Sequence, residues 1–212
     1  MMENTELPDE LTLLQRARAG EWDAFEALMD RLEPRVFALN MRLLRQHHDA
    51  EDATQQTFIK VMENLDSFRG EASVSTWVLR IATNHSLTML RKRRPERNLP
   101  LEVGGTGNDG EGRMPHPEYI AHWKDNPADL AQRAEVRQLL EDALQDLDEK
   151  YRVVFTLRDM EQFSTRETAE LLDISESNVK VRLLRARLQL REKLTRSLGD
   201  EETRIEPSDH RH

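Results

Sequence analysis

Apolar residues recur every three or four positions along most of this chain, a spacing that is typical of amphipathic helices. The first clear example is a set of large apolar residues, which are Phe25, Leu28, Leu32, Val36, Leu39 and Leu43. A second helix is expected to start at Asp49, whose side chain is predicted as the N-cap, with Asp52 in the first turn. After a break at Gly70, a third helix is expected from residues 73–75 up to the basic residues that begin at Arg91.

The periodic pattern stops at Pro95, because proline cannot continue a helix. Prolines and glycines then recur without a period, which predicts a flexible linker over residues 95–127. Within it, residues 116–123 carry Tyr119, Ile120 and Trp123, and they are expected to form a short ordered piece that docks elsewhere. Helical spacing then returns, and helices are predicted over residues 129–145 and 149–160.

These patterns predict an all-α protein made of two small helical domains joined by a flexible linker. The domains are expected to span residues 11–94 and 128–198, and the polar ends, residues 1–10 and 199–212, are expected to be disordered. A chain of 212 residues suits two small domains, and its many Leu, Ala, Glu, Arg and Gln residues favour helix.

The second half of the chain carries the pattern of a helix-turn-helix. Ser164 followed by Glu167 predicts a capping box at the start of a helix that ends near residue 172, and Ala169 is the small residue that close helix approach needs. Ser175 is expected to cap the next helix, whose apolar positions at 179 and 183 face inward. The residues expected on its outward or flanking faces are Glu176, Ser177, Asn178, Lys180, Arg182 and Arg185. Such a helix enters the major groove of double-stranded DNA.

Charge is distributed unevenly along the chain. The net charge of −9 argues against non-specific DNA binding by the chain as a whole. Two stretches are nevertheless strongly basic, residues 91–94 and residues 180–196. An acidic chain with two concentrated basic stretches suggests two DNA contacts and a separate acidic surface.

Several classes of protein are excluded by what the sequence lacks. There are no cysteines, which rules out disulfides, thiolate catalysis and cysteine-based zinc sites. No segment resembles a signal peptide or a membrane span, so a soluble, cytoplasmic protein is expected. Neither a glycine-rich phosphate loop nor a catalytic or metal-binding constellation occurs, and the adjacent His47 and His48 are poorly placed to chelate a metal. We therefore expect a protein that is not an enzyme and needs no cofactor.

The helix expected after Asp49 is unusual because it begins with three acids and continues with Gln55, Gln56 and Phe58. It suits two interpretations: a capped surface helix, or a docking face for a basic protein partner.

Taken together, these motifs resemble bacterial RNA polymerase sigma factors of the extracytoplasmic-function (ECF) group. One block is similar to sigma region two and contains Asp49-Ala50-Glu51-Asp52, Gln55-x-Thr57-Phe58, Phe68-Arg69-Gly70, Thr76-Trp77-x-x-Arg80-Ile81-Ala82-x-Asn84 and Arg91-Lys92-x-Arg94. The second block, residues 147–193, is similar to region four. The resemblance covers about residues 11–94 and 129–194.

The resemblance implies two roles for the first domain. Its acidic helix would bind the β′ clamp helices of core RNA polymerase through Asp49, Glu51, Asp52, Gln55, Gln56 and Phe58. The turn and helix that follow would hold the −10 promoter element, with one unstacked base near residues 69–73. The −10 residues would be Arg69, Arg80, Asn84, Arg91, Lys92, Arg93 and Arg94. Trp77 is expected in the core rather than against a base.

The second domain would bind the −35 element as duplex and contact the β flap. The residues implied are Arg158, Ser177, Asn178, Lys180, Val181, Arg182, Leu184 and Arg185. Lys180 stands where relatives usually have arginine, and lysine lacks the fork that pairs with guanine. The linker would pass through the RNA path of the polymerase, where Asp109 and Glu111 either mimic RNA charge or serve solubility alone. An anti-sigma factor is a common partner in this family.

Two other functions are compatible with parts of the pattern. A self-sufficient transcriptional regulator would use the helix-turn-helix as a dimer on palindromic DNA, but no dimerisation helix is apparent and the acidic helix would have no role. An enzyme would need a constellation of catalytic residues that the sequence does not contain. Promoter recognition as a polymerase subunit accounts for both helical domains.

Overall fold

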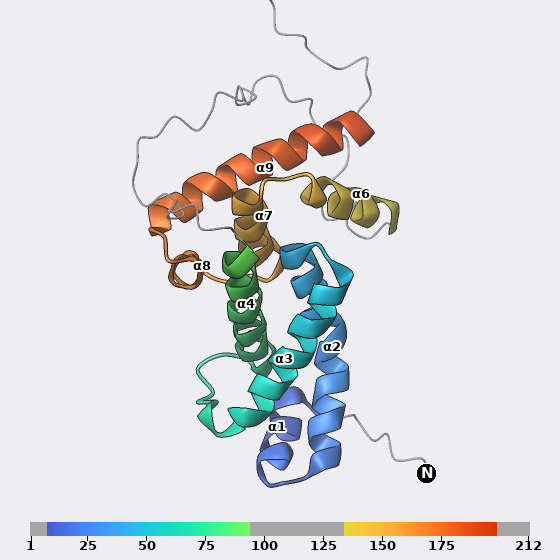
Figure 1. Cartoon of the computed structure of the whole chain (residues 1–212), viewed down its shortest axis with the longest axis vertical. Coiled ribbons are helices and arrows are strands. Elements are labelled where there is room, and N and C mark those ends of the chain that lie inside the picture. Colours follow the sequence, from blue (N-terminus) through green and yellow to red (C-terminus); the bar gives the residue numbers. More distant parts are fainter. Residues whose placement is uncertain (1–7, 94–133, 199–212) are drawn as a thin grey trace, which may run out of the picture. The chain divides into compact units, whose positions relative to one another are not determined.

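The computed structural model describes residues 8–93 and 134–198, and all regular structure in these two ranges is helical. The chain divides into two units, residues 1–97 and residues 98–212 (Figure 1). The prediction of an all-α fold with two groups of helices is therefore confirmed. Several predictions fall outside the described residues: the linker over 95–127 with Asp109, Glu111 and residues 116–123, the basic residue Arg94, and the tail from residue 199.

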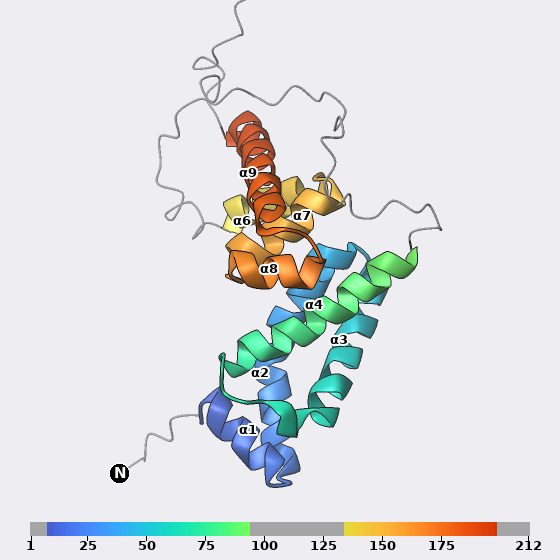
Figure 2. The same ribbon diagram turned by 90° about the vertical axis from the view of Figure 1, so that its left-hand side faces the viewer.

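The first unit is a bundle of four α-helices and one short 3-10 turn. The elements are α1 (Glu10–Arg18), α2 (Trp22–Leu44), α3 (His47–Glu63), η1 (Leu65–Ser67) and α4 (Val74–Arg93). Helices α2, α3 and α4 each pack against the other two, while α1 packs mainly against α2 (Figure 2). All six apolar positions that predicted α2 are buried, so that helix is the centre of the core.

A buried polar network ties the three long helices together. The side-chain amide of Asn40 on α2 donates to the hydroxyl of Thr54 on α3 at 3.0 Å, and the hydroxyl of Ser86 on α4 donates to the Asn40 carbonyl oxygen at 2.8 Å. All three side chains are buried, and Thr54 also donates to the carbonyl of Ala50 at 2.7 Å. Because buried polar groups are costly unless they are paired, this network favours one arrangement of α2, α3 and α4.

The start of α3 differs from the prediction. The helix begins at His47 and its N-cap is Gln46, so the prediction that Asp49 is the N-cap is wrong. Helix α2 ends at Leu44, and its C-cap Arg45 has a left-handed backbone with φ of 60°. This tight reversal lets α3 begin two residues before Asp49. The Asp49 carboxylate forms an ion pair with Arg93 of α4.

The beginning of the chain is also more ordered than predicted. Residues 8–10 were expected to be disordered, but Asp9 is the N-cap of α1 and accepts a hydrogen bond from the backbone amide of Thr12 at 2.8 Å. Glu10 is the first residue of α1, and its carboxylate accepts from the backbone amide of Ser75 on α4 at 3.1 Å. The first turn of α1 therefore helps to hold the start of α4.

The second unit is built around the long helix α9. Its elements are α6 (Ala134–Gln145), α7 (Glu149–Phe155), the π-helical turn η3 (Thr156–Met160), α8 (Thr165–Leu172) and α9 (Glu176–Leu198). Helices α6, α7 and α8 all pack against α9. The predicted helix over residues 149–160 is present, but its second half is wound as a π-helix. Residues 129–133 of the other predicted helix lie outside the described ranges.

The helix-turn-helix has the predicted local structure. Ser164 and Glu167 form both hydrogen bonds of a capping box, and Ser175 accepts from the backbone amide of Asn178 at 3.2 Å at the start of α9. Val179 and Leu183 are buried as predicted. Asp173 occupies the left-handed turn position, with φ of 55°, where glycine is common and where aspartate is tolerated.

Candidate nucleic-acid and partner interfaces

The acidic helix α3 presents a polar outward face. Glu51, Asp52, Gln55 and Gln56 are exposed, whereas Asp49 and Phe58 are partly buried. The face that they share points away from the buried residues of α3, which are Ala50, Ala53, Thr54, Thr57 and Val61. Glu51 and Asp52 each have a histidine neighbour one turn earlier. Nδ1 of His47 lies 3.4 Å from Oε1 of Glu51, and Nε2 of His48 lies 3.7 Å from Oδ2 of Asp52.

The polar face of α3 continues into an apolar stripe that sequence reasoning did not identify as a surface. Ile59 and Met62 are exposed at 42% and 43%. Ile59 follows Asp52 by seven residues, nearly two helical turns, and therefore lies on the same side of the helix. A partner that covers Glu51 and Asp52 can therefore bury Ile59 and Met62 as well. The helical spacing of these residues along α3 could have predicted their exposed position.

Three of the predicted −10 residues line one side of α4. Arg80, Asn84 and Arg91 follow the spacing of a single helical face. Asn84 and Arg91 are exposed, as is Lys92, while Arg80 is partly buried. Arg69 is exposed in the turn before the helix, next to Gly70, whose φ of 75° favours glycine. Trp77 is partly buried and packs edge-on against the buried Phe68 at 5.5 Å, as the core interpretation expects.

Arg93 differs from its neighbours in the basic stretch. Its guanidinium pairs with Asp49 and also donates to the backbone carbonyl of Leu44 at 3.3 Å. A residue predicted to bind DNA and a residue predicted to bind the polymerase therefore contact each other. Arg93 joins the end of α4 to the start of α3 and the end of α2.

Positive charge extends from α4 towards α3. Burial lowers the pKa of His85, and the positive charges of Lys92 and Lys60 lower it further. Lys60 is on α3 and was not among the predicted DNA contacts, so the cationic region beside Asn84 is shared by two helices. Neutral His85 adds no charge to this region near neutral pH.

A hollow lies beside the turn that precedes α4. Its walls come from the start of α1, from Arg31 on α2 and from the turn itself. The lining residues are Asp9, Glu10, Leu11, Arg31, Phe68, Gly70, Ala72, Ser73 and Val74. Sequence reasoning placed an unstacked base near residues 69–73 but did not identify α1 as a wall of the site.

The predicted −35 helix α9 has one strongly exposed side. Ser177, Lys180, Val181 and Leu184 are exposed, with Val181 at 48% and Leu184 at 55%, while Asn178 and Arg185 are partly buried. Arg182, which was expected on an outward or flanking face, is only 8% exposed. Arg182 follows buried Val179 by three residues and precedes buried Leu183, which places it at the border of the inner face.

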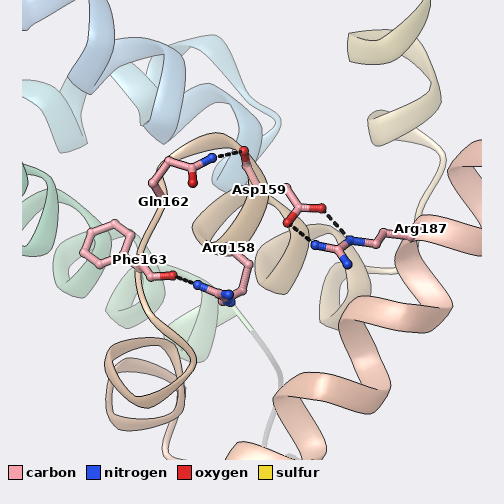
Figure 3. Close-up of polar contacts among 5 residues, drawn as sticks. All are labelled: Arg158, Asp159, Gln162, Phe163 and Arg187. Carbon is pink, nitrogen blue, oxygen red and sulfur yellow. Dashed lines mark hydrogen bonds and ion pairs between the residues drawn. The ribbon is translucent and has the colours of Figure 1, made fainter. Parts of the chain in front are cut away.

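Acidic residues from neighbouring elements offset part of the charge of α9. Asp159 on η3 accepts two hydrogen bonds from Arg187 (Figure 3), and Asp146 lies 3.1 Å from the ammonium group of Lys193. Arg185 donates to the hydroxyl of Tyr151 at 3.3 Å. The basic stretch from residue 180 to residue 196 is therefore a less continuous cationic surface than its sequence suggests.

Arg158, the predicted backbone contact before the motif, has a structural partner. Its guanidinium donates to the backbone carbonyl of Phe163, across the turn that joins η3 to α8 (Figure 3). An arginine has five N–H donors, so this bond leaves others for a phosphate.

Two features are absent from the described ranges. In residues 8–93 and 134–198, no helix is long and apolar enough to cross a membrane. The same part of the chain contains no group of three or more metal-ligating side chains that could hold an ion.

Comparison with known proteins relates each unit to a described family. Residues 28–96 match sigma-70 region 2, and residues 137–190 match sigma-70 region 4. The ECF RNA polymerase sigma factor SigW of Bacillus subtilis is 33% identical over 181 residues, covering 85% of this chain and 94% of that protein. The ECF RNA polymerase sigma-E factor of Haemophilus influenzae is 29% identical over 185 residues, covering 86% and 93%.

A solved structure of a sigma factor has a similar fold. The sigma factor RpoE of Bartonella quintana, crystallised with the anti-sigma factor NepR, superposes with a TM-score of 0.53 at 26% identity. The match covers 81% of this chain and 96% of that one.

Proposed function

Since the chain belongs to the ECF group of bacterial RNA polymerase sigma factors, we propose that it binds core RNA polymerase and directs it to promoters with defined −10 and −35 elements. Residues 11–94 would act as sigma region two and residues 128–198 as region four, joined by residues 95–127. The chain supplies binding energy and no catalytic group, since the polymerase performs the chemistry.

The outward face of α3 is the proposed polymerase contact. Glu51, Asp52, Gln55 and Gln56 are exposed together on one helix, and Ile59 continues that face as an exposed apolar residue. Such a face suits the β′ clamp helices, because complementary charge steers association while apolar contact adds affinity. Asp49 contributes less directly, because its carboxylate is engaged by Arg93.

The proposed −10 site lies on the exposed side of α4 and the turn before it. Asn84 presents an amide that can hydrogen-bond the edge of an unstacked base, and Arg91 and Lys92 are exposed for phosphate contacts. Arg69 is exposed at the entrance to the turn. Arg80 lies one helical turn before Asn84 and completes this surface.

The proposed −35 site is the exposed side of α9. Ser177 and Lys180 offer hydrogen-bonding groups near the start of the helix, where helix-turn-helix proteins contact base edges. Val181 and Leu184 offer apolar contact suited to thymine methyl groups. Arg158, Asn178 and Arg185 would contact the backbone. A lysine at position 180 favours a less stringent preference for guanine than an arginine would.

Partners other than DNA follow from the same family. The β flap would contact the region-four unit. An anti-sigma factor is also proposed as a partner, because the solved relative from Bartonella quintana was crystallised with one.

The observation that carries this proposal is that α3, α4 and α9 each have a separate exposed face with hydrogen-bonding or charged side chains, within two units that match regions two and four. The test is in vitro transcription with purified core RNA polymerase and a pool of genomic promoter fragments, followed by sequencing of the transcript ends. We expect transcripts with shared −10 and −35 sequences only when the chain is added. Initiation at no defined site, together with tight binding of palindromic duplex by the chain alone, would contradict the proposal and indicate a self-sufficient regulator.

A further inference from the structure

Asp159 holds Arg187 in a two-point ion pair. The Nε of Arg187 lies 2.8 Å from Oδ2 of Asp159, and its Nη2 lies 2.7 Å from Oδ1 (Figure 3). This fork-to-fork geometry is the strongest form of arginine–carboxylate contact, and it raises the pKa of Arg187. The side chain of Asp159 is 24% exposed and that of Arg187 is 55% exposed, so the pair is at the surface of the second unit.

The backbone around Asp159 is held independently of this pair. Asp159 lies in the π-helical turn η3, and its carbonyl accepts from the side-chain amide of Gln162 at 2.7 Å. The amide of Phe163 donates to the carbonyl of Leu157 at 2.9 Å and closes the turn. Asp159 is therefore presented to α9 by a fixed turn, and π-helical turns of this kind are frequent at functional sites.

Arg187 lies where a contact with the DNA backbone is expected. It follows Lys180 by seven residues, which is nearly two helical turns, so both residues are on the same side of α9. They are separated by about 10 Å along the helix axis. Arg158, the proposed phosphate contact on η3, is the immediate neighbour of Asp159. The ion pair thus joins η3 and α9, the two elements that carry the proposed DNA contacts of this unit.

We propose that Asp159 withholds Arg187 from the phosphate backbone and so lowers the sequence-independent affinity of this unit for duplex DNA. This inference rests on the proposed function of α9. The pair has no net charge, and a phosphate that approaches Arg187 also meets the Asp159 carboxylate.

The consequence concerns specificity. Phosphate contacts add affinity for any sequence, whereas contacts to base edges distinguish sequences. Because Asp159 neutralises Arg187, a larger share of the binding free energy comes from Ser177, Lys180 and the exposed apolar residues of α9. Asp159 is therefore a specificity-determining residue that does not itself touch DNA.

The test measures binding of the full-length chain to a fluorescein-labelled 30-base-pair duplex of random sequence, by fluorescence anisotropy over a series of KCl concentrations. Asp159→Asn removes the negative charge with little change in shape. We expect several-fold tighter binding and a slope of log K against log[KCl] that is steeper by about 0.9, the value for one additional phosphate contact. Arg187→Gln alone should leave binding unchanged, and in the Asp159→Asn background it should abolish the gain.

A matched control separates this effect from net charge. Asp146→Asn changes the charge of the same unit by the same amount and weakens a single-point contact between Asp146 and Lys193. If Asp146→Asn gives the same gain as Asp159→Asn, or if Arg187→Gln alone weakens binding, the proposal is overturned. Circular dichroism checks that each variant is folded. If Asp159→Asn unfolds the unit, two other variants test the proposal. Asp159→Glu keeps the charge and must bind like the wild type, and Arg187→Gln must leave binding unchanged.

Failure of this inference can be separated from failure of the proposed function. A chain that directs promoter-specific transcription with core polymerase, but whose Asp159→Asn variant binds random duplex like the wild type, overturns only the role of Asp159. A chain that directs no such transcription overturns the proposed function, and the inference fails with it.

Discussion

Arg93 at the end of α4 forms an ion pair with Asp49 in the first turn of α3, and the same guanidinium donates to the carbonyl of Leu44 at the end of α2. Three helix ends are therefore joined by one arginine. The sequence pattern assigned Arg93 to DNA and Asp49 to the polymerase, because each belongs to a stretch of like charge. Their contact indicates that both residues also help to hold the bundle together.

Arg93→Gln is expected to lower the free energy of unfolding of the first unit by about 1 kcal/mol, since it removes one partly exposed ion pair and a charged hydrogen bond. Asp49→Asn should have a similar effect, and the double variant should lose less than the sum of the two. Urea denaturation followed by circular dichroism measures all three. Additive losses would show that the two residues act separately, and Arg91→Gln serves as an exposed control on the same helix end.

The buried amide of Asn40 gives a second prediction about stability. Asn40→Ala removes the amide that donates to Thr54 and the carbonyl oxygen that accepts from Ser86. The buried Ser86 hydroxyl then loses that acceptor. We expect the free energy of unfolding to fall by about 2 kcal/mol, because hydrogen bonds are lost and the Ser86 hydroxyl is left buried without its acceptor. Thr88→Ala, at an exposed site on α4, should change it by less than about 0.5 kcal/mol. Equal effects of the two substitutions in urea denaturation would contradict the role of the network.

Charge reversal at Asp52 tests the polymerase face of α3. Asp52 is exposed on that face, so Asp52→Lys should weaken binding to core RNA polymerase by at least tenfold, while the fold and the affinity for duplex DNA stay the same. Glu26→Lys makes the same charge change at an exposed site on α2 and should have little effect. Binding is measured with labelled chain and purified core enzyme. Equal losses in both variants would indicate a general effect of net charge.

The pKa of His85 predicts a dependence of stability on pH. Burial and the charges of Lys92 and Lys60 lower this pKa below its ordinary value near 6.5, so the unfolded chain binds a proton at a higher pH than the folded chain does. Stability contributed by neutral His85 is therefore fully present above about pH 6.5 and is lost as the pH falls below that value. Between pH 7.5 and pH 5.5, the urea midpoint should fall less in His85→Gln than in the wild type. An identical fall in both proteins would contradict this.

Periodicity predicted the elements whose shape depends on neighbours in the sequence. The core face of α2, the capping box at Ser164 and the break at Gly70 all depend on residues within a few positions of one another, and all are present. Asp49 was wrongly predicted as the N-cap of α3, because the reversal at Arg45 starts the helix two residues earlier, and its carboxylate pairs instead with Arg93, which is distant along the chain. Spacing along the chain contains no information about such a tertiary contact.

In the candidate sites, too, the sequence predicted features that depend on nearby residues but not those that depend on tertiary contacts. The exposed residues of α9 followed from helical spacing, but the burial of Arg182 did not, because it lies at the border of the inner face, where a helical pattern alone does not decide burial. The neutralisation of Arg187 by Asp159 was missed for a different reason. A π-helical turn changes the direction in which η3 presents its side chains, and the sequence carries no clear signal for that turn.

Asn84 separates the two proposed activities of the first unit. Its amide is exposed on α4, one helical turn after Arg80, and forms no part of the outward face of α3. Asn84→Ala should therefore leave the affinity for core polymerase unchanged and slow promoter opening by about tenfold to a hundredfold, the loss expected when one or two hydrogen bonds to an unstacked base disappear. Opening is measured by the fluorescence of 2-aminopurine placed in the −10 element, using holoenzyme at saturating DNA. On a template that is already unpaired over the −10 element, the cost of opening is absent and the variant should lose less. If Asn84→Ala weakens core binding instead, the amide belongs to the polymerase interface and the assignment of α4 to DNA is wrong.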